Sequence, residues 1–529
     1  MRGRRCAHPA ARVAGAWTVA RVRAAEDALL ARVPLGTLMR RAAFGLATRT
    51  AAVLAGRTGG VAGRHVSLLV GAGNNGGDAL WAGAFLRRRG VAVTAVLLSP
   101  DRTHSQGLAA LRRAGGHVVE QVPERAHLVL DGIVGLAGRG PLRPAAARVV
   151  QAVRVPIIAV DSPSGVDPDT GAVSGPAVSA TETVTFGVLK PVHLLAPWRC
   201  GPVHLVDIGL GAELGEPDLR VLTPAQIGAL WPVPGPTSDK YNQGVVGVAA
   251  GSVDYPGAAV LCVGAAVLAT SGMVRFAGTV ADAVRSRWPE VVATASVSDA
   301  GRVQAWAVGP GLGTGAASRE VLAHVLAAGV PVVADADAIT LLGRHPELRD
   351  SRDPDTPLVL TPHDREFERL TGEAAGADRV GAVRQAATRF NAVIVLKGNT
   401  TLIAAPDGRV LANPARSAWP ATAGSGDVLT GVIGALLAAG LEPVTAAAAA
   451  VHAHELAATL AATRPVPAAL RPTTAFWGQN AVTGPPMSAF WGQNAITGPP
   501  VGAPAPASAI LAALSEAIRV LRAAAGMRG

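Results

Sequence analysis

Short apolar runs of the kind that form buried strands alternate with helical patterns along most of this 529-residue chain. This alternation constrains the fold most, because strands that are apolar on both faces belong to sheets with helices packed on both sides. We therefore expect mostly parallel α/β sheets. In the first half, helical patterns cover residues 19–33, 36–57 and 78–89, and strand patterns cover residues 65–71, 91–99, 127–135 and 155–165.

A proline-rich stretch separates this series from a second one of the same kind. Five prolines fall within residues 213–238, and we interpret 213–235 as a linker. We predict two tandem α/β domains, over residues 17–212 and 236–529. In the second half, helical patterns cover residues 257–270, 427–439 and 508–523, and strand patterns cover residues 245–251, 303–313, 330–338, 357–363, 392–400 and 401–408.

The net charge of +11 is concentrated at the start of the chain. Residues 1–57 hold eleven arginines against Glu26 and Asp27, so the rest of the chain carries only +2. This distribution favours an enzyme with a basic, disordered leader at residues 1–16 over a nucleic-acid groove. Only three basic residues are lysines, namely Lys190, Lys240 and Lys397, which suggests that a compact ammonium group is needed there.

Three further features concern location and low complexity. The three scattered cysteines offer no disulfide framework and suit a reducing cytosol, so we expect a cytoplasmic protein. The uncharged stretch at 255–274 is diluted by proline and glycine, and we interpret it as a buried helix with no membrane partner. Residues 463–507 contain AFWGQNAVTGPP and then AFWGQNAITGPP, a 14-residue repeat that we interpret as a low-complexity insertion.

The first group of candidate site residues follows the strand pattern at 65–71. The sequence GAGNNGGD also satisfies the G-x-G-x-x-G pattern of dinucleotide-binding turns. Asn74, Asn75 and Asp78 add polar groups that ordinary phosphate turns lack, and Asp131, Asp161 and Ser164 follow other strand patterns. Such hard oxygen donors with little charge would suit a monovalent cation, although turn-forming residues in loops give the alternative explanation.

The second group centres on ATAGSGDVLTG at 421–431. Its small residues deliver Asp427 to the start of an apolar helix, where the amides of Gly424, Ser425 and Gly426 would form an anion hole. Asp427 would then take a proton from a hydroxyl beside the anion, although it could instead only cap the helix. Lys397, GPGLG at 309–313, and His363 with Glu366 follow other strand patterns, and Walker-type spacing is absent.

The first half resembles the NAD(P)H-hydrate epimerase domain over residues 17–212, through NNGGDAL, DGIVG with GRGP, and VDSPSGVDPDTG. The resemblance implies a Rossmann-like, three-layer fold. It implies a potassium ion held by Asn75, Asp131 and Ser164. Asp161 is our candidate proton-transfer group at the hydrated ring carbon, because it is a carboxylate at the end of a strand pattern. The resemblance also implies substrate contacts at Asn74, Asn75, Gly76, Gly77, Asp78, Gly135, Leu136, Ala137, Gly138, Arg139, Gly140, Pro141 and Asp161.

The second half resembles the ribokinase-like NAD(P)H-hydrate dehydratase family over residues 236–462 and 508–523. KYNQGVVGVAAGS, GPGLG, TPHDREF, LKGNT and AGSGDVL occur in the family's order. The resemblance implies ADP as co-substrate, with Asp427 catalytic. It implies hydrate contacts at Ala258, Gly313, His363 and Asp427, and nucleotide contacts at Lys397, Gly398, Asn399, Thr400, Thr401 and Gly426.

The tandem order resembles the bacterial bifunctional NAD(P)H-hydrate repair enzymes, so we expect the first domain to interconvert R and S hydrates and the second to dehydrate the S form. Mg²⁺ is expected with the nucleotide, because phosphoryl charge must be neutralised. We also expect a homo-oligomer. A small-metabolite kinase with a nucleotide-sensing first domain and an NAD-dependent dehydrogenase stay open, as does the choice between ADP and ATP.

Overall fold

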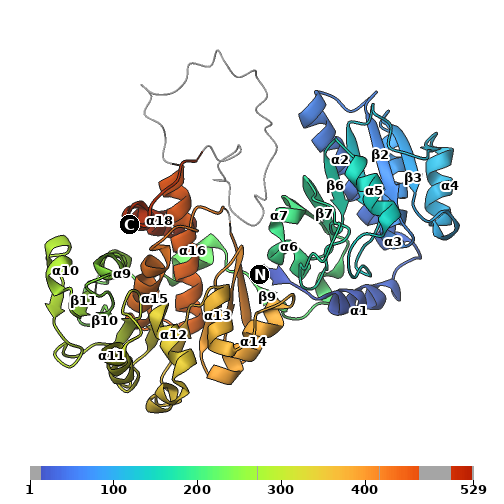
Figure 1. Cartoon of the computed structure of the whole chain (residues 1–529). Coiled ribbons are helices and arrows are strands. Elements are labelled where there is room, and N and C mark those ends of the chain that lie inside the picture. The colour runs from blue at the N-terminus through green and yellow to red at the C-terminus, as the bar shows by residue number, and fades with distance from the viewer. Residues whose placement is uncertain (1–13, 271, 416, 464–501, 527–529) are drawn as a thin grey trace, which may run out of the picture. The chain divides into compact units, whose positions relative to one another are not determined.

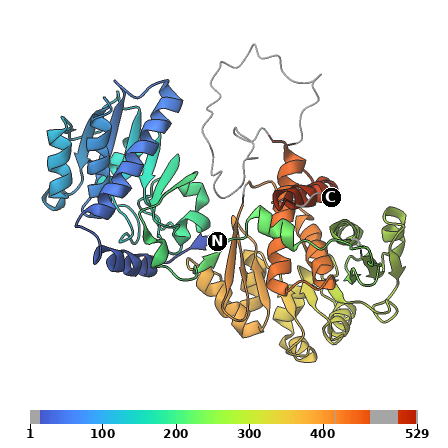
Figure 2. The ribbon, with the colours of Figure 1, turned by 180° about the vertical axis from the view of Figure 1, so that it is seen from behind.

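The computed structural model describes residues 14–270, 272–415, 417–463 and 502–526 of the chain. These residues divide into two compact units, one running to Val221 and the other starting at Leu222. Most of the expected leader and of the repeat-bearing insertion lies outside the described residues. Figures 1 and 2 show strands flanked by helices in each unit, in agreement with the predicted α/β class.

The first unit contains a seven-stranded sheet whose neighbouring strands are all parallel. Its order is β4-β3-β2-β5-β6-β7-β8, which is the order of a Rossmann fold with one further strand at the β8 edge. The strands are β2 (His65–Val70), β3 (Ala92–Leu97), β4 (His117–Val118), β5 (Leu128–Gly132), β6 (Ile157–Val160), β7 (Glu182–Phe186) and β8 (Val203–Val206).

Helices cover both faces of this sheet. Val66, Leu68 and Val70 of β2 pack against α1, α2 and α3, whereas Leu69 of the same strand packs with Ala146 of α5 on the opposite face. This alternation along one strand produces the three layers expected from the sequence. The helices are α1 (Val19–Leu30), α2 (Thr37–Thr58), α3 (Asn74–Arg87), α4 (Ser105–Arg113), α5 (Pro144–Ala152), α6 (Pro191–Leu195) and α7 (Pro197–Cys200).

The second unit contains a nine-strand arrangement, in the order β18-β17-β16-β15-β14-β13-β10-β11-β12. Strands from β16 to β12 in this order pair in parallel, and β17 and β18 add an antiparallel edge. The strands are β10 (Val245–Ala249), β11 (Met273–Ala277), β12 (Val292–Thr294), β13 (Ala305–Val308), β14 (Val332–Ala334), β15 (Leu358–Leu360), β16 (Val393–Leu396), β17 (Thr400–Ala404) and β18 (Val410–Pro414).

The largest core of this unit lies between one face of the sheet and helices α8, α9, α15, α16 and α18. Helix α14 contacts β16 and β17 without contributing to this core, which places it on the other face. The helices are α8 (Pro224–Leu230), α9 (Pro256–Ala269), α10 (Ala281–Arg287), α11 (Ala316–Leu326), α12 (Asp337–Arg344), α13 (Asp364–Thr371), α14 (Arg379–Phe390), α15 (Ser425–Ala438), α16 (Pro443–Ala462) and α18 (Ala507–Ala524).

The segment expected as a linker contains secondary structure. Strand β9 (Leu219–Arg220) pairs with β1 (Gly15–Ala16), and Pro224 stands at the start of α8. Proline is well accommodated at the first helical positions, where its missing N–H would have no acceptor. A proline-rich stretch can therefore still contain the start of a helix. The uncharged stretch at 255–274, interpreted as a buried helix, holds α9. None of the described helices is long and apolar enough to cross a membrane.

Candidate active sites

The first candidate site lies at the carboxyl ends of β2, β5 and β6. Between β2 and β5 the strand order of a Rossmann fold reverses, and ligands bind at that point in such sheets. The turn after β2 passes close to the chain after β5, because a Cβ at Gly71 would lie 1.8 Å from the carbonyl oxygen of Ile133. Helix α3 begins at Asn74, four residues before its predicted start, so the polar pair Asn74 and Asn75 lies in its first turn.

A cavity of about 830 Å³ opens at this edge of the sheet. Trp81 and Glu26 line this cavity. Gly77, one of the predicted substrate contacts, does not line it, because that residue packs against Met39 and His104. The other predicted substrate contacts all line it, namely Asn74, Asn75, Gly76, Asp78, Gly135, Leu136, Ala137, Gly138, Arg139, Gly140, Pro141 and Asp161.

Asp161 follows β6 directly and has a strained backbone. Its φ of +67° lies in the left-handed region, which a non-glycine residue adopts only where its surroundings enforce it. The Nζ atom of Lys190 lies 2.5 Å from its Oδ1. Burial raises the pKa of Asp161, but the charge and hydrogen bond of Lys190 outweigh it and leave the pKa below its usual range.

Lys190 and His193 enforce this arrangement from the chain after β7. Lys190 is 1 % exposed, and its ammonium also donates to Thr185 Oγ1 and to the carbonyl of Phe186. His193 accepts from the Lys190 amide through Nδ1, so Nε2 carries the proton that it donates to the Asp161 carbonyl. Burial lowers the pKa of His193 to about 4, so the imidazole is neutral.

Asp78 projects from the second turn of α3 into the same cavity. It is 6 % exposed, and its carboxyl accepts no hydrogen bond from any described residue. Burial, followed by the charges of Asp161 and Glu26, raises the pKa of Asp78 well above its ordinary value. Burial also raises the pKa of Glu26. The cavity is therefore lined by Asp161, whose pKa is lowered, and by Asp78 and Glu26, whose pKa values are raised.

The three residues expected to hold potassium also meet at this edge. Ser164 donates to Asp131 through both its amide (2.9 Å) and its hydroxyl (2.7 Å). Asn75 donates to the Val160 carbonyl, which leaves its amide oxygen free to accept. Burial raises the pKa of Asp131 to about 6, and a bound cation would favour its ionised form. The described residues contain no cluster of three or more His, Cys, Asp or Glu side chains suited to a metal.

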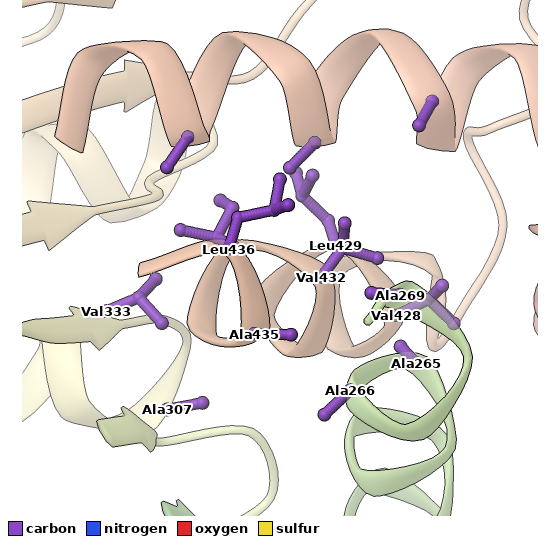
Figure 3. Close-up of a cluster of buried hydrophobic side chains, with 14 of the residues drawn as sticks. Ala265, Ala266, Ala269, Ala307, Val333, Val428, Leu429, Val432, Ala435 and Leu436 are labelled. Carbon is purple, nitrogen blue, oxygen red and sulfur yellow. The ribbon is translucent and has the colours of Figure 1, made fainter. Parts of the chain in front are cut away.

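The second candidate site is built on the start of α15. Figure 3 shows Val428, Leu429 and Leu436 of this helix in the core beside α9 and the sheet. The two helices approach closely, because a Cβ at Gly431 would lie 2.1 Å from the carbonyl oxygen of Cys262. Such dense packing holds the first turn of α15 in a fixed place at the carboxyl ends of the strands.

Asp427 is the third residue of α15, and the N-cap position belongs to Gly424 with a φ of +82°. The Asp427 carboxyl is half-buried and accepts no hydrogen bond from the described residues, which argues against a capping role. Burial, followed by the charge of Asp335, raises the pKa of Asp427 to about 7. The amide of Ser425 donates to the carbonyl of Thr422, so it is not available to the predicted anion hole. The amide of Gly426 lies in the first turn of the helix and is available.

Asp335 and Lys397 form an ion pair beneath this turn. Lys397 Nζ lies 2.9 Å from Asp335 Oδ1, and Thr430 of α15 donates to Asp335 Oδ2 at 3.0 Å. A Cβ at Gly426 would lie 3.2 Å from Asp335 Oδ2 and 3.5 Å from Lys397 Nζ, so glycine allows the helix to sit directly on the pair. Lys397 keeps 23 % of its side chain exposed.

His363, one of the expected hydrate contacts, caps α13. Its Nδ1 accepts from the amides of Arg365 and Glu366, and Glu366 accepts from the His363 amide. The side chain stays 48 % exposed. Glu366 Oε2 also lies 3.7 Å from Lys397 Nζ, which brings this strand end into the same charged cluster.

The remaining expected contacts lie at neighbouring strand ends. The amide of Gly313 donates to Asp337, and the Ala258 side chain packs beneath Gly311. Gly398 and Asn399 are exposed, Thr401 is half-buried and Thr400 is buried at the start of β17. The strand ends predicted to converge therefore do lie along one edge, with the ion pair of Asp335 and Lys397 at their centre.

Comparison with known proteins decides the family. The bifunctional NAD(P)H-hydrate repair enzyme Nnr of Mycobacterium tuberculosis (strain CDC 1551 / Oshkosh) is 58% identical over 435 residues, which cover 82% of this chain and 91% of the relative. The chain belongs to the bifunctional NAD(P)H-hydrate repair enzymes. The family member from Mycobacterium leprae is 57% identical over 454 residues, covering 85% of this chain and 95% of the relative.

Two family profiles match this repair-enzyme chain, one in each of its two units. Residues 35–192 match the profile of the YjeF-related protein N-terminus, and residues 246–477 match that of NAD(P)H-hydrate dehydratase. A solved ADP/ATP-dependent NAD(P)H-hydrate dehydratase from Bacillus subtilis, co-crystallized with ATP/Mg²⁺, is 32% identical, with a TM-score of 0.42. The match covers 46% of this chain and 89% of that one.

Several residues of these sites were not predicted to belong to them. Lys190, Thr185 and His193 lie 24 to 32 residues from Asp161 along the chain and contact it only in the folded unit. Asp335 was overlooked although its sequence context, two aspartates directly after an apolar run, resembles that of the residues that were selected. The scarcity of lysine was the usable signal, because Lys190 and Lys397 each pair with a buried aspartate.

Proposed function

We propose that this chain repairs hydrated nicotinamide nucleotides in two steps. The first unit interconverts the R and S forms of NADH or NADPH hydrate, and the second dehydrates the S form with ADP, releasing AMP and phosphate. The observation that carries the proposal is the Asp427 carboxyl, which has no hydrogen-bond partner among the described residues and stands at the positive end of α15. Membership of the repair-enzyme family supports both activities.

In the dehydratase step, Asp427 takes the proton of the C6 hydroxyl while the hydroxyl oxygen attacks the terminal phosphoryl group of ADP. The bond from that phosphorus to the bridging oxygen breaks, and AMP leaves. Phosphate then departs from C6, and loss of a proton from C5 restores the dihydropyridine. A pKa of about 7 suits this base, because a carboxyl of that affinity is substantially ionised at neutral pH and still accepts a proton readily.

The nucleotide would lie against Lys397, Gly398, Asn399, Thr400, Thr401 and Gly426. Lys397 is held by Asp335 yet keeps part of its side chain exposed, so its charge can still act on a phosphate. Mg²⁺ would accompany the nucleotide and neutralise phosphoryl charge. Mg²⁺ usually keeps several waters and binds through phosphates and one or two carboxylates, so the nucleotide itself would supply part of its ligands.

In the epimerase step, Asp161 acts as the proton-transfer group at the hydrated ring carbon, with the hydrate in the 830 Å³ cavity. Potassium would be held by Asn75, Asp131 and Ser164. Their oxygens and single formal charge fit a monovalent cation better than a transition metal. The ion would hold the chain after β5 and β6 in place, and it would take no part in proton transfer, which the carboxyl groups would carry out.

Incubation of the full chain with mixed R and S hydrates and ADP tests the proposal. We expect all of the hydrate to be converted to NADH or NADPH, as monitored by the absorbance of the reduced nicotinamide ring. AMP and phosphate should form in equal amounts. A phosphorylated product that accumulates without the reduced ring would instead identify a small-metabolite kinase. Hydride transfer to an alcohol or aldehyde would identify a dehydrogenase.

Location and assembly belong to the same proposal. We propose a cytoplasmic homo-oligomer that binds neither nucleic acid nor membrane. Cys200 and Cys262 are free and buried, and burial raises the pKa of both thiols, which fits a reducing compartment without requiring it. Light scattering of the purified chain measures the oligomeric state directly.

A further inference from the structure

The two carboxyls of the first site differ in how they are bonded. The ammonium of Lys190, the hydroxyl of Thr185 and the amide of Phe186 all donate to Asp161 Oδ1, at 2.5, 2.9 and 3.3 Å. No described donor reaches Oδ2. Asp161 is therefore held as an ionised carboxylate by one oxygen, and the other oxygen is left for a ligand in the cavity that it lines.

Asp78 is the opposite case. It lines the same cavity and is more than nine-tenths buried, but neither of its oxygens has a hydrogen-bond donor among the described residues. A buried carboxylate without a donor is costly, whereas a protonated carboxyl needs only an acceptor. Because Asp78 lines the cavity, a ligand there can accept the Asp78 proton.

We propose that Asp78 is the acid and Asp161 the base of the epimerase half, and that Lys190 is a positioning residue that holds Asp161 ionised with its free oxygen in the cavity. This inference rests on the proposed function and gives it a second catalytic residue. It also assigns one of the chain's three lysines a role away from the ligand, since Lys190 is 1 % exposed and donates to three protein oxygens.

Inversion at C6 requires that one bond from C6, to oxygen or to N1, breaks and re-forms. Asp161 removes the hydroxyl proton as the C6–N1 bond breaks, and Asp78 gives its proton to N1, which leaves an aldehyde and an enamine N–H. Rotation about C5–C6 presents the other face of the aldehyde. N1 then attacks C6 and returns its proton to Asp78, and Asp161 returns its proton to the oxygen. Atoms and charge balance, and no further reactant is needed.

The charged surroundings favour this division of roles. The charged groups that act on Asp78 are Glu26 from α1, Asp161 after β6 and Lys190 at the start of α6. Burial and the charges of Asp161 and Glu26 raise the pKa of Asp78, and the charge of Lys190 only partly opposes them. Lys190 instead acts mainly on Asp161, whose pKa it lowers against the effect of burial.

The first test compares Asp78→Asn with Glu124→Gln, which removes one exposed carboxyl of the same unit. With mixed hydrates and ADP, we expect the control to convert all hydrate. Asp78→Asn should convert the S fraction in a normal fast phase and then slow by at least about 100-fold, because positioned proton transfer is typically worth that much. Its melting temperature should equal or exceed that of the unmodified chain, since an unpartnered buried carboxyl is lost.

The outcomes separate the two proposals. If the unmodified chain itself stops after the S fraction, the proposed epimerase function is wrong. If the unmodified chain converts everything and Asp78→Asn does so at the same rate, Asp78 is not the acid. In ¹⁸O-labelled water, inversion by ring opening keeps the original oxygen on C6, apart from slow exchange of the aldehyde with water. Incorporation of one ¹⁸O atom at the C6 hydroxyl per inversion would overturn the step.

The positioning role of Lys190 is tested by the pH profile of epimerisation. Lys190→Met should move the acidic limb of kcat/KM to higher pH, because Asp161 loses the charge that lowers its pKa. Thr185→Val removes one donor from the same oxygen and should shift the limb in the same direction by less. Thr185→Val provides the same test if the Lys190→Met variant does not fold. A lower rate with an unmoved limb in both variants would overturn the role.

Discussion

Each unit of this chain pairs a buried aspartate with a lysine at the carboxyl end of a parallel sheet, and the two pairs are used differently. In the first unit Lys190 is 1 % exposed and its partner Asp161 lines the cavity. In the second unit Lys397 keeps 23 % of its side chain exposed, and its partner Asp335 lies buried beneath α15. The carboxyl proposed as the base is thus paired with a lysine in the first unit, and it has no such partner in the second.

This difference sets the proton affinity of each proposed base. The charge of Lys190 lowers the pKa of Asp161, whereas burial and the charge of Asp335 raise the pKa of Asp427 to about 7. A weak base suffices where a second carboxyl supplies the acid, as proposed for Asp78. A stronger base is needed where the hydroxyl must become a nucleophile toward a phosphoryl group.

The largest expected effect is a double separation of the two activities. Asp427→Asn should reduce dehydration by at least about 100-fold through loss of the base, while R and S hydrates still interconvert. Asp161→Asn should do the reverse. Chiral separation of the remaining hydrate measures both rates in one sample, and loss of both activities in either variant would break the comparison.

A smaller effect is expected in the pH dependence. Dehydration should rise as the pH increases through about 7, because Asp427 must be ionised to act as a base. Epimerisation should keep its base ionised to lower pH, because the pKa of Asp161 is below its usual range. Parallel kcat/KM profiles measure this contrast, and superimposable acidic limbs would contradict it.

Asp335→Asn sharpens the same comparison. Removal of the buried charge beside Asp427 should lower the pKa of Asp427 and move the acidic limb of dehydration to lower pH. The epimerisation profile of that variant serves as the internal control and should not move. A limb that shifts to higher pH would show that Lys397, freed from its partner, no longer acts on Asp427.

Stability should report the raised pKa of Asp427 independently of activity. A carboxyl whose pKa rises from 3.8 unfolded to about 7 folded stabilises the fold at low pH, and this contribution is lost as the pH increases through about 7. Asp427→Asn cannot ionise, so its melting temperature should exceed that of the unmodified chain by a few degrees at pH 8. The two should melt together near pH 4.

The sequence predicted those parts of the fold and sites that depend on local patterns. Strands with motif-bearing ends, such as β2 and β16, were found because periodicity and turn chemistry act over a few residues. Short strands such as β9 and the pairing of Lys397 with Asp335, 62 residues apart, were not found, because they form only through tertiary contacts. The motif also concealed the start of α3, since two of its glycines, Gly76 and Gly77, lie inside the helix.

The smallest expected effect is that of deleting residues 473–500, which lie outside the described residues and hold the repeat. The chain leaves α16 and returns toward α18 at one place, because the amide of Ala503 donates to the carbonyl of Ala462 at 3.0 Å. A shortened connection can therefore close without moving either helix. Gly502 packs against Trp419 and must be kept. Dehydration by the deletion variant should match the unmodified chain, and a large fall in kcat with unchanged melting would assign the repeat a part in catalysis.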